Sequence, residues 1–381
     1  IIGQLYKRIS SRAYLEYAVS DRIKFISDFS LTNSDNHRSY TNLLDIAYRK
    51  MPNVSVYEQD SKGNNTDIYF SIPRSSSLNK DQRDSENPVA LAYLAKNELQ
   101  SFRILPTFRL QYDLLDPQKS ILRLSSYVSF DINNNKTSLF KPQDVTNAPW
   151  TEDGVNKADN SDSESMTIYT DNNLVWEPKF ENTNHSLMLY GSFQLNSGSW
   201  NNQGIISGSI ASVDAVDASN QAYLQDAGTG HSSYRSLGIM GRGHYAYKSR
   251  YIVDGTWRRD GSTKFGEKNK WGDFPGVSLK WIITDEPFMK SSKKVLSMFA
   301  FRPAWGISGN QPGSEYLHFS RYNTYGTYMD LTAIKPQSLQ LSNLKWETTT
   351  SFNYGLDLGL FEDKYVFDLN FYKKHTKDLL F

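Results

Sequence analysis

Side chains that could catalyse a reaction occur along this 381-residue chain without a recognisable catalytic spacing. The six histidines form no H-E-x-x-H pair or other metal-ligand spacing, and neither a phosphate-binding G-x-x-x-x-G-K-[ST] loop nor a G-x-S-x-G elbow occurs. Carboxylates are so numerous that chance alone supplies glycosidase-like pairs. The chain also has no cysteine, which removes thiolate chemistry. We therefore expect a protein that is not an enzyme and that holds no cofactor and no metal.

Composition narrows the class of protein further. The 42 basic and 41 acidic residues leave a net charge of +1, so the chain lacks the excess of positive charge that binding to nucleic acid requires. Aromatic residues make up 14% of the chain, and Tyr and Trp suit both membrane interfaces and sugar-binding surfaces. No run of about 18 apolar residues is present, so the sequence predicts no transmembrane helix.

Alternation with a period of two is the clearest structural signal. In residues 352–360, large apolar side chains occupy the even positions and small or polar ones the odd positions. After Glu362-Asp363-Lys364 the alternation resumes over 365–371, which predicts a tight hairpin. A strand between lipid and a wet lumen needs one apolar and one polar face. Similar stretches lie at 13–19, 23–31, 108–114, 122–132, 187–195, 245–257, 277–283 and 299–307.

The predicted connections alternate between short and long. Short ones lie near residues 21, 117, 249 and 363, and long polar ones lie near 33–100, 133–165, 197–232, 260–275 and 309–343. Outer-membrane barrels have short periplasmic turns and long extracellular loops. We therefore predict an all-β fold in which residues 1–381 form part of one antiparallel transmembrane β-barrel, with about a dozen strands. The alternative is a secreted, soluble all-β protein that binds or cleaves glycans.

Two parts of the chain carry unusual residue combinations. The first spans 245–288, where Asp260-Gly261 predicts a turn, with Arg259 anchoring the loop to a carboxylate such as Asp260. The second begins at Arg302–Asn310, where Pro303 predicts a barrel rim or bulge because it lacks an N–H. The motif residues, for which we expect structural roles, are Arg259, Asp260, Gly261, Phe265, Gly266, Trp271, Phe274, Pro275, Trp281, Gly306, Gly309, Asn310, Trp346 and Glu347.

These blocks, together with 353–357 and 372–380, resemble the SusC/RagA-type TonB-dependent transporters of Bacteroidetes-like bacteria. The resemblance implies a bacterial outer-membrane protein that imports large nutrients, either glycan oligosaccharides or peptides. It also implies a barrel of about 22 strands, of which this chain holds about half. A plug and a TonB box, which are absent from this chain, would precede Ile1.

The resemblance further implies partners. These are a SusD-like lipoprotein lid, the TonB-ExbB-ExbD complex acting through the N-terminal part, and outer-membrane lipid. Because a half-barrel has two unpaired edges, we expect the missing half or another chain to pair with them. Aromatic residues in the long loops could stack on sugar rings or could instead pack against the lid, and the candidates are Trp200, Tyr316, Tyr322 and Tyr325. A passive porin is a further alternative.

Overall fold

Twelve antiparallel strands form one sheet, in which each strand pairs with the sheet strand that follows it in the chain. The computed structural model describes residues 3–40, 42–73, 75–78, 80–116, 120–146, 148–149, 152, 154–210 and 224–380. The sheet strands are β1 (Leu5–Ser20), β2 (Ile23–His37), β5 (Lys96–Asp113), β6 (Ser120–Lys141), β7 (Lys157–Pro178), β8 (His185–Ser207), β9 (Leu224–Tyr247), β10 (Tyr251–Ser262), β11 (Trp271–Ile282), β12 (Leu296–Asn310), β15 (Glu347–Leu360) and β16 (Tyr365–Lys377). The all-β prediction with about a dozen strands is confirmed.

The register places apolar side chains of neighbouring strands on one side of the sheet. Leu356, for example, pairs with Phe301 on β12 and with Leu369 on β16. This apolar face remains exposed, with Leu279 and Phe352 both above 40% accessible. The opposite, polar face carries the charged residues of the same strands. Alternating side chains therefore do not meet in a dry interior, as they would in a soluble sandwich.

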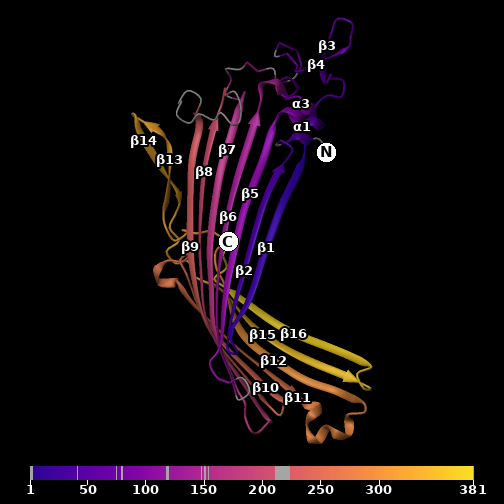
Figure 1. Ribbon diagram of the computed structural model, residues 1–381, viewed down its shortest axis with the longest axis vertical. Helices are drawn as coiled ribbons and strands as arrows, with labels where there is room; N and C mark the ends of the chain where they lie inside the picture. The colour runs from indigo at the N-terminus through magenta and orange to yellow at the C-terminus, as the bar shows by residue number, and fades with distance from the viewer. Residues whose placement is uncertain are drawn as a thin grey trace.

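Strand length differs sharply along the sheet. Strands β6–β9, which we call the tall wall, contain 22 to 24 residues, whereas β10–β12, the short wall, contain 12 to 15. Figure 1 shows the tall strands rising towards the end of the sheet that carries α1 (Leu43–Arg49) and α3 (Pro88–Leu94). The hairpin of β13 (Arg321–Tyr328) and β14 (Leu331–Ser338) stands beside β9. It belongs to the long connection between β12 and β15.

Four of the five long connections are shorter than the sequence predicts, because the flanking strands extend further than expected. These four span 38–95, 142–156, 208–223 and 263–270, whereas the fifth, 311–346, is about as long as predicted and is shifted along the chain. Strand β7 lies partly within the predicted loop 133–165, and β8 and β9 both extend into the predicted loop 197–232. In these extensions most side chains are polar whichever face they occupy, so the alternation that identifies a strand disappears.

The predicted position of Pro303 is also wrong. Pro303 lies in the middle of β12, opposite Tyr354 of β15. The pairing of β12 with β11, however, passes from Ala304–Ser278 to Phe301–Trp281 without a bridge in between. The missing N–H is therefore accommodated by a gap in one ladder and not by a position at the rim.

The connection from β2 to β5 contains most of the helical structure. It holds α1 (Leu43–Arg49), β3 (Tyr57–Gln59), β4 (Asn65–Tyr69), α2 (Lys80–Arg83) and α3 (Pro88–Leu94). Helix α3 begins where the Asn87 side chain accepts hydrogen bonds from the amides of Val89 and Ala90, with proline in the first turn. Leu91 of α3 is buried with Val145. Among the described residues, no helix is long and apolar enough to cross a bilayer.

Candidate functional site

Ion pairs between neighbouring strands line the polar face. Arg103 of β5 lies 2.5 Å from Asp131 of β6, and Arg123 of β6 lies 2.7 Å from Asp113 of β5. In the short wall and beyond it, Arg302 contacts Asp357 at 2.5 Å and Asp368 at 3.0 Å. Partly exposed pairs of this kind contribute only about 0–1 kcal/mol each. Their main effect is to give this face fixed, alternating charges.

Two hollows open on the polar face between these pairs. One, of about 280 Å³, lies where small residues meet on adjacent strands, among them Gly276, Ala304 and Gly306. The other, of about 440 Å³, is lined by side chains that include Arg109 and Asp171. The Arg109 guanidinium lies 5.5 Å from the centre of the Tyr127 ring, within range of a cation–π contact. The polar face can therefore hydrogen-bond to a polar solute at several levels.

Motif residues from three segments meet at the end of the short wall near the long connections. Phe265 is fully buried, and its ring centroid lies 4.7 Å from that of Trp346, while the Phe274 ring lies 5.4 Å from Trp346. We call these three residues the rim cluster. Gly309 lies beneath it, where an added Cβ would overlap the Phe274 ring. The motif residues thus bring together the ends of β10, β11, β12 and β15.

The turn predicted at Asp260-Gly261 is wrong. Both residues lie in β10, where Gly261 pairs with Trp271. A Cβ at Gly261 would come within 2.7 Å of the Trp271 ring, so close packing accounts for the glycine. Alternation also places Arg259 and Asp260 on opposite faces of the sheet. Asp260 therefore pairs with Arg258 at 2.7 Å. Arg259 does lie near a carboxylate, as predicted, but it is that of Asp273 at 4.0 Å, and its guanidinium stacks over the Trp271 ring at 5.4 Å.

The long connection between β12 and β15 is anchored below its hairpin. The Lys264 ammonium donates to the carbonyls of Pro312 and Gly313 and lies 3.5 Å from Glu315. The Tyr316 hydroxyl accepts a hydrogen bond from the Ser233 amide at 2.8 Å. Ser233 belongs to the part of β9 that extends beyond its pairing with β10. Side chains of the connection therefore replace the strand that is missing at this edge.

The remaining motif residues also occupy structural positions. The Glu347 carboxylate accepts from the Leu380 amide at 3.1 Å, and the Asn310 side chain accepts from the Gln311 amide at 3.0 Å. Gly266 precedes the 3-10 turn Glu267–Asn269. Pro275 lies in β11 opposite Trp257. A structural role for these residues remains a prediction that their contacts support.

Trp281 lies at the opposite end of the short wall, next to a buried carboxylate. Its indole N–H donates to Glu286 at 3.0 Å, and the Glu286 carboxylate also accepts from Tyr251 and from Arg250. These donors stabilise the ionised form, with Tyr251 the largest influence, and hold the pKa of Glu286 below its usual value. The sequence suggested no such site, because Glu286 and Tyr251 are 35 residues apart.

The four aromatic candidates for substrate binding do not form one site. Trp200 lies on the polar side of β8 and pairs with Ser232, one residue from the Ser233 that bonds Tyr316. The indole of Trp200 donates to Ser163 at 2.7 Å, and about two-fifths of the residue is exposed. Tyr322 and Tyr325, by contrast, project from the exposed β13–β14 hairpin. Their role in substrate binding remains a prediction.

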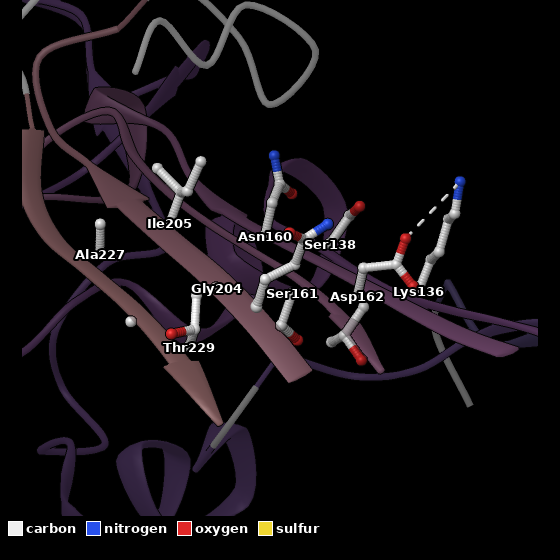
Figure 2. A pocket seen from close by; sticks show the side chains of 12 residues that line it. Lys136, Ser138, Asn160, Ser161, Asp162, Gly204, Ile205, Ala227 and Thr229 are labelled. Carbon is white, nitrogen blue, oxygen red and sulfur yellow. Dashed lines mark ion pairs between the residues drawn. The ribbon is translucent and has the colours of Figure 1, made fainter. Parts of the chain in front are cut away.

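A further hollow, of about 650 Å³, lies on the upper tall wall (Figure 2). Figure 2 shows Asp162 in an ion pair with Lys136 across β6 and β7, at a distance of 4.0 Å. Lys136 and Asp162 are also register partners on β6 and β7. Lys136 lies on the apolar face, because it follows Phe130 and Ile132 along β6 in steps of two. This hollow therefore opens away from the polar face.

A sheet with one exposed apolar face, one ion-paired face and connections of unequal length forms the wall of a transmembrane β-barrel. Residues 22–381 match the family described as TonB dependent receptor-like, beta-barrel. The chain belongs to this family, whose β-barrels are outer-membrane proteins. The resemblance to SusC/RagA-type transporters predicted from the motif blocks is confirmed.

Individual relatives agree with this assignment. The chain is 26% identical to the TonB-dependent receptor P39 of Formosa agariphila over 100% of its own length and 34% of that protein's. It is 36% identical to the TonB-dependent receptor SusC of Bacteroides thetaiotaomicron, over 38% of this chain and 15% of SusC. The chain thus spans about a third, or less, of the curated relatives it matches.

The solved structure of the RagAB peptide transporter has the same fold. It superimposes with a TM-score of 0.76 at 19% identity, covering 99% of this chain and 41% of that chain. At this identity the likeness shows the fold alone. It supports the arrangement of the twelve strands as consecutive strands in the wall of a larger barrel.

Proposed function

We propose that this chain forms part of the barrel of an energy-coupled importer in the outer membrane of a bacterium. Its cargo would be large nutrients, with glycan oligosaccharides as the first candidate and peptides as the second. The observation that carries the proposal is the contrast between the two faces, because an exposed apolar face suits lipid and a hydrogen-bonding, ion-paired face suits a polar solute. Transport of this kind requires no covalent chemistry, so we propose no enzymatic role.

Oligosaccharides are favoured by Trp200. Its ring lies on the polar face near the long connections, with about two-fifths of the residue exposed, and the indole N–H is already bound to Ser163. A fixed aromatic ring next to hydrogen-bonding groups is suited to stack on a sugar. The peptide alternative is supported by the printed description of RagAB as a peptide transporter, which shares this fold.

The proposed partners follow from the same role. A SusD-like lipoprotein would cover the mouth of the barrel at the end that carries the long connections. The TonB-ExbB-ExbD complex would supply energy through a part of the protein outside this chain. Without energy coupling the barrel would act as a passive porin, which is the outcome to be excluded.

Growth of a strain that lacks the full-length protein tests the proposal. We expect the strain to lose growth on specific oligosaccharides and to regain it with the wild-type gene, only while TonB is present. Trp200→Ala should raise the half-saturating oligosaccharide concentration about three- to tenfold, which corresponds to ~0.7–1.4 kcal/mol. Trp257→Ala is the matched control, because Trp257 is equally exposed but lies on the apolar face.

Three results would count against this proposal. Loss of growth on peptides alone would select the peptide alternative. Uptake that persists without TonB would indicate a passive pore. Equal effects of the Trp200 and Trp257 substitutions, at equal protein levels in the membrane, would remove Trp200 from the transport path.

A further inference from the structure

A second groove, distinct from the hollows of the polar face, opens on the apolar side at the junction of the two walls. We call it the outer groove; its volume is about 510 Å³. Two rungs of the sheet form its floor and one side, Met166–Ser199–Ser233 and Ile168–Ser197–Arg235. These positions continue the apolar face, since Leu237 and Ile239 follow Arg235 along β9 in steps of two. The groove therefore faces away from the lumen.

The lining of the outer groove is chemically ordered. Met166 and Ile168 form an apolar side, and three serines form a floor of small side chains. Arg235 and Lys270 lie towards the short wall. The rest of the lining comes from the sheet and the connections, at Gly198, Tyr234, Thr263, Tyr316, His318 and Phe319. Among the described residues, no carboxylate lines this groove or lies within ion-pair distance of Arg235 or Lys270. The groove therefore offers two uncompensated cations next to apolar surface.

The position of the groove along the strands, relative to the apolar band, also bears on what it can bind. On β7 this face reads Trp176, Leu174, the polar pair Asn172 and Thr170, then Ile168 and Met166, and its next position is Glu164. On β9 it reads Ile239 and Leu237 before Arg235. The groove thus sits where the apolar band ends, which in a transmembrane barrel is the boundary with the polar headgroups.

Above the groove, the same face is mainly polar, with Ile205 and Ala227 as apolar exceptions near its top. The Asn201 side chain bonds to His231 at 2.6 Å, and Asn134, Gln203 and Thr229 continue the surface upward. Glu164 belongs to this level, but it lies on β7, two strands away from Arg235 on β9. From bottom to top, the face therefore offers apolar, cationic and hydrogen-bonding surface in succession.

We propose that the outer groove binds a phosphorylated glycolipid of the outer leaflet. Such a lipid presents acyl chains, phosphate and sugar in the order in which the protein presents apolar, cationic and hydrogen-bonding surface. Arg235 and Lys270 bind the phosphate, and charge-assisted hydrogen bonds of this type are about twice as strong as neutral ones. The acyl chains lie against Ile168 and Met166, and the serine floor leaves room for them. This site is separate from the proposed transport path.

Titration of labelled bisphosphorylated lipid A into the full-length transporter in detergent tests the proposal. We expect saturable binding that weakens at least tenfold in the double variant Arg235→Gln/Lys270→Gln. Lipid A from which both phosphates have been removed should bind at least tenfold more weakly to the wild-type protein. The matched control is Lys248→Gln/Lys290→Gln, which removes two exposed lysines at the opposite end of the sheet and should leave binding unchanged.

A substitution that retains both charges checks the shape of the site. Ser197→Phe fills the floor of the outer groove and should also weaken binding at least tenfold, even if the charge variant fails to fold. Equal binding by the Arg235/Lys270 variant and the control would overturn the proposal, as would equal binding of the phosphate-free lipid. Full competition by inorganic phosphate at equal concentration would assign the site to free phosphate instead. None of these results depends on nutrient uptake.

Discussion

The tall wall and the short wall keep their upper ends in place by different means. Strands β6–β9 pair with one another over almost their entire length, and the pairing of β8 with β9 runs from His185–Tyr247 to Ser207–Leu224. Strands β10–β12 end about ten residues earlier. There, the rim cluster and the Lys264 and Tyr316 contacts hold the long connection in position.

The difference explains where the recognisable motifs occur. A backbone ladder can form with almost any polar side chains, so the tall wall needs no particular sequence above the apolar band. Side-chain packing requires particular shapes, and the short wall accordingly contains Phe265, Phe274, Gly309 and Trp346 at fixed places. Three substitutions test whether the two walls differ in this way.

The largest effect is expected for Phe265→Ala. Removal of a fully buried phenylalanine costs about 3–5 kcal/mol. Because this loss exceeds what the hydrogen bonds of Lys264 and Tyr316 contribute, the peptides that cover 262–270 and 311–320 should exchange amide hydrogens more than a hundredfold faster. Hydrogen exchange monitored by mass spectrometry on the full-length protein measures this. Thr229→Ala on the tall wall should leave exchange of its own strand within about twofold, and a comparable acceleration there would contradict the distinction between the walls.

A smaller loss is expected for Gly309→Ala. The added methyl group would overlap the Phe274 ring, which Trp346 and Phe265 prevent from moving aside. Overpacking of this kind costs about 1–3 kcal/mol. The thermal midpoint of the full-length protein, or local hydrogen exchange at 344–350, reports the loss. Gly255→Ala is the control, because a Cβ there meets nothing within 4 Å, and equal losses at the two glycines would refute the packing account.

Tyr316→Phe should give the smallest effect. The change removes the hydroxyl that accepts from the Ser233 amide and leaves the ring in place. A single neutral hydrogen bond contributes about 1 kcal/mol, so the Ser233 amide should exchange about fivefold faster. Residues of β9 that pair with β10 should not change. Acceleration along the whole of β9 would show that Tyr316 supports the strand and not only its free edge.

The sequence predicts the architecture well where the two faces differ. The alternation in 352–371 predicts β15 and β16 and the tight turn between them, because apolar and polar side chains alternate over 352–360 and 365–371, the parts of the two strands next to the turn. It predicts no strand between 133 and 186, although β7 lies there. The first part of β7, from Lys157 to Glu164, is polar on both faces except at Ala158, so it has no periodic signal.

The site is predicted less completely, for a geometric reason. Motif residues such as Phe265 and Trp346 can be singled out, but they are far apart in the chain, and only the strand register shows that their rings touch. The same holds for Arg302 with Asp357 and Asp368, whose pairing spans three strands. The outer groove depends on three serines that carry no signal of their own.

The uninterrupted ladders of the tall wall also restrict how such a protein can evolve. Extra residues in β7 would slip its register against both β6 and β8 unless each neighbour grew as well, and an odd number would turn every side chain beyond them to the other face. The strands of the tall wall can therefore become longer only when neighbouring strands gain residues together and when each gains an even number. The β13–β14 hairpin has no such neighbours among the described strands, so its length can diverge freely between descendants.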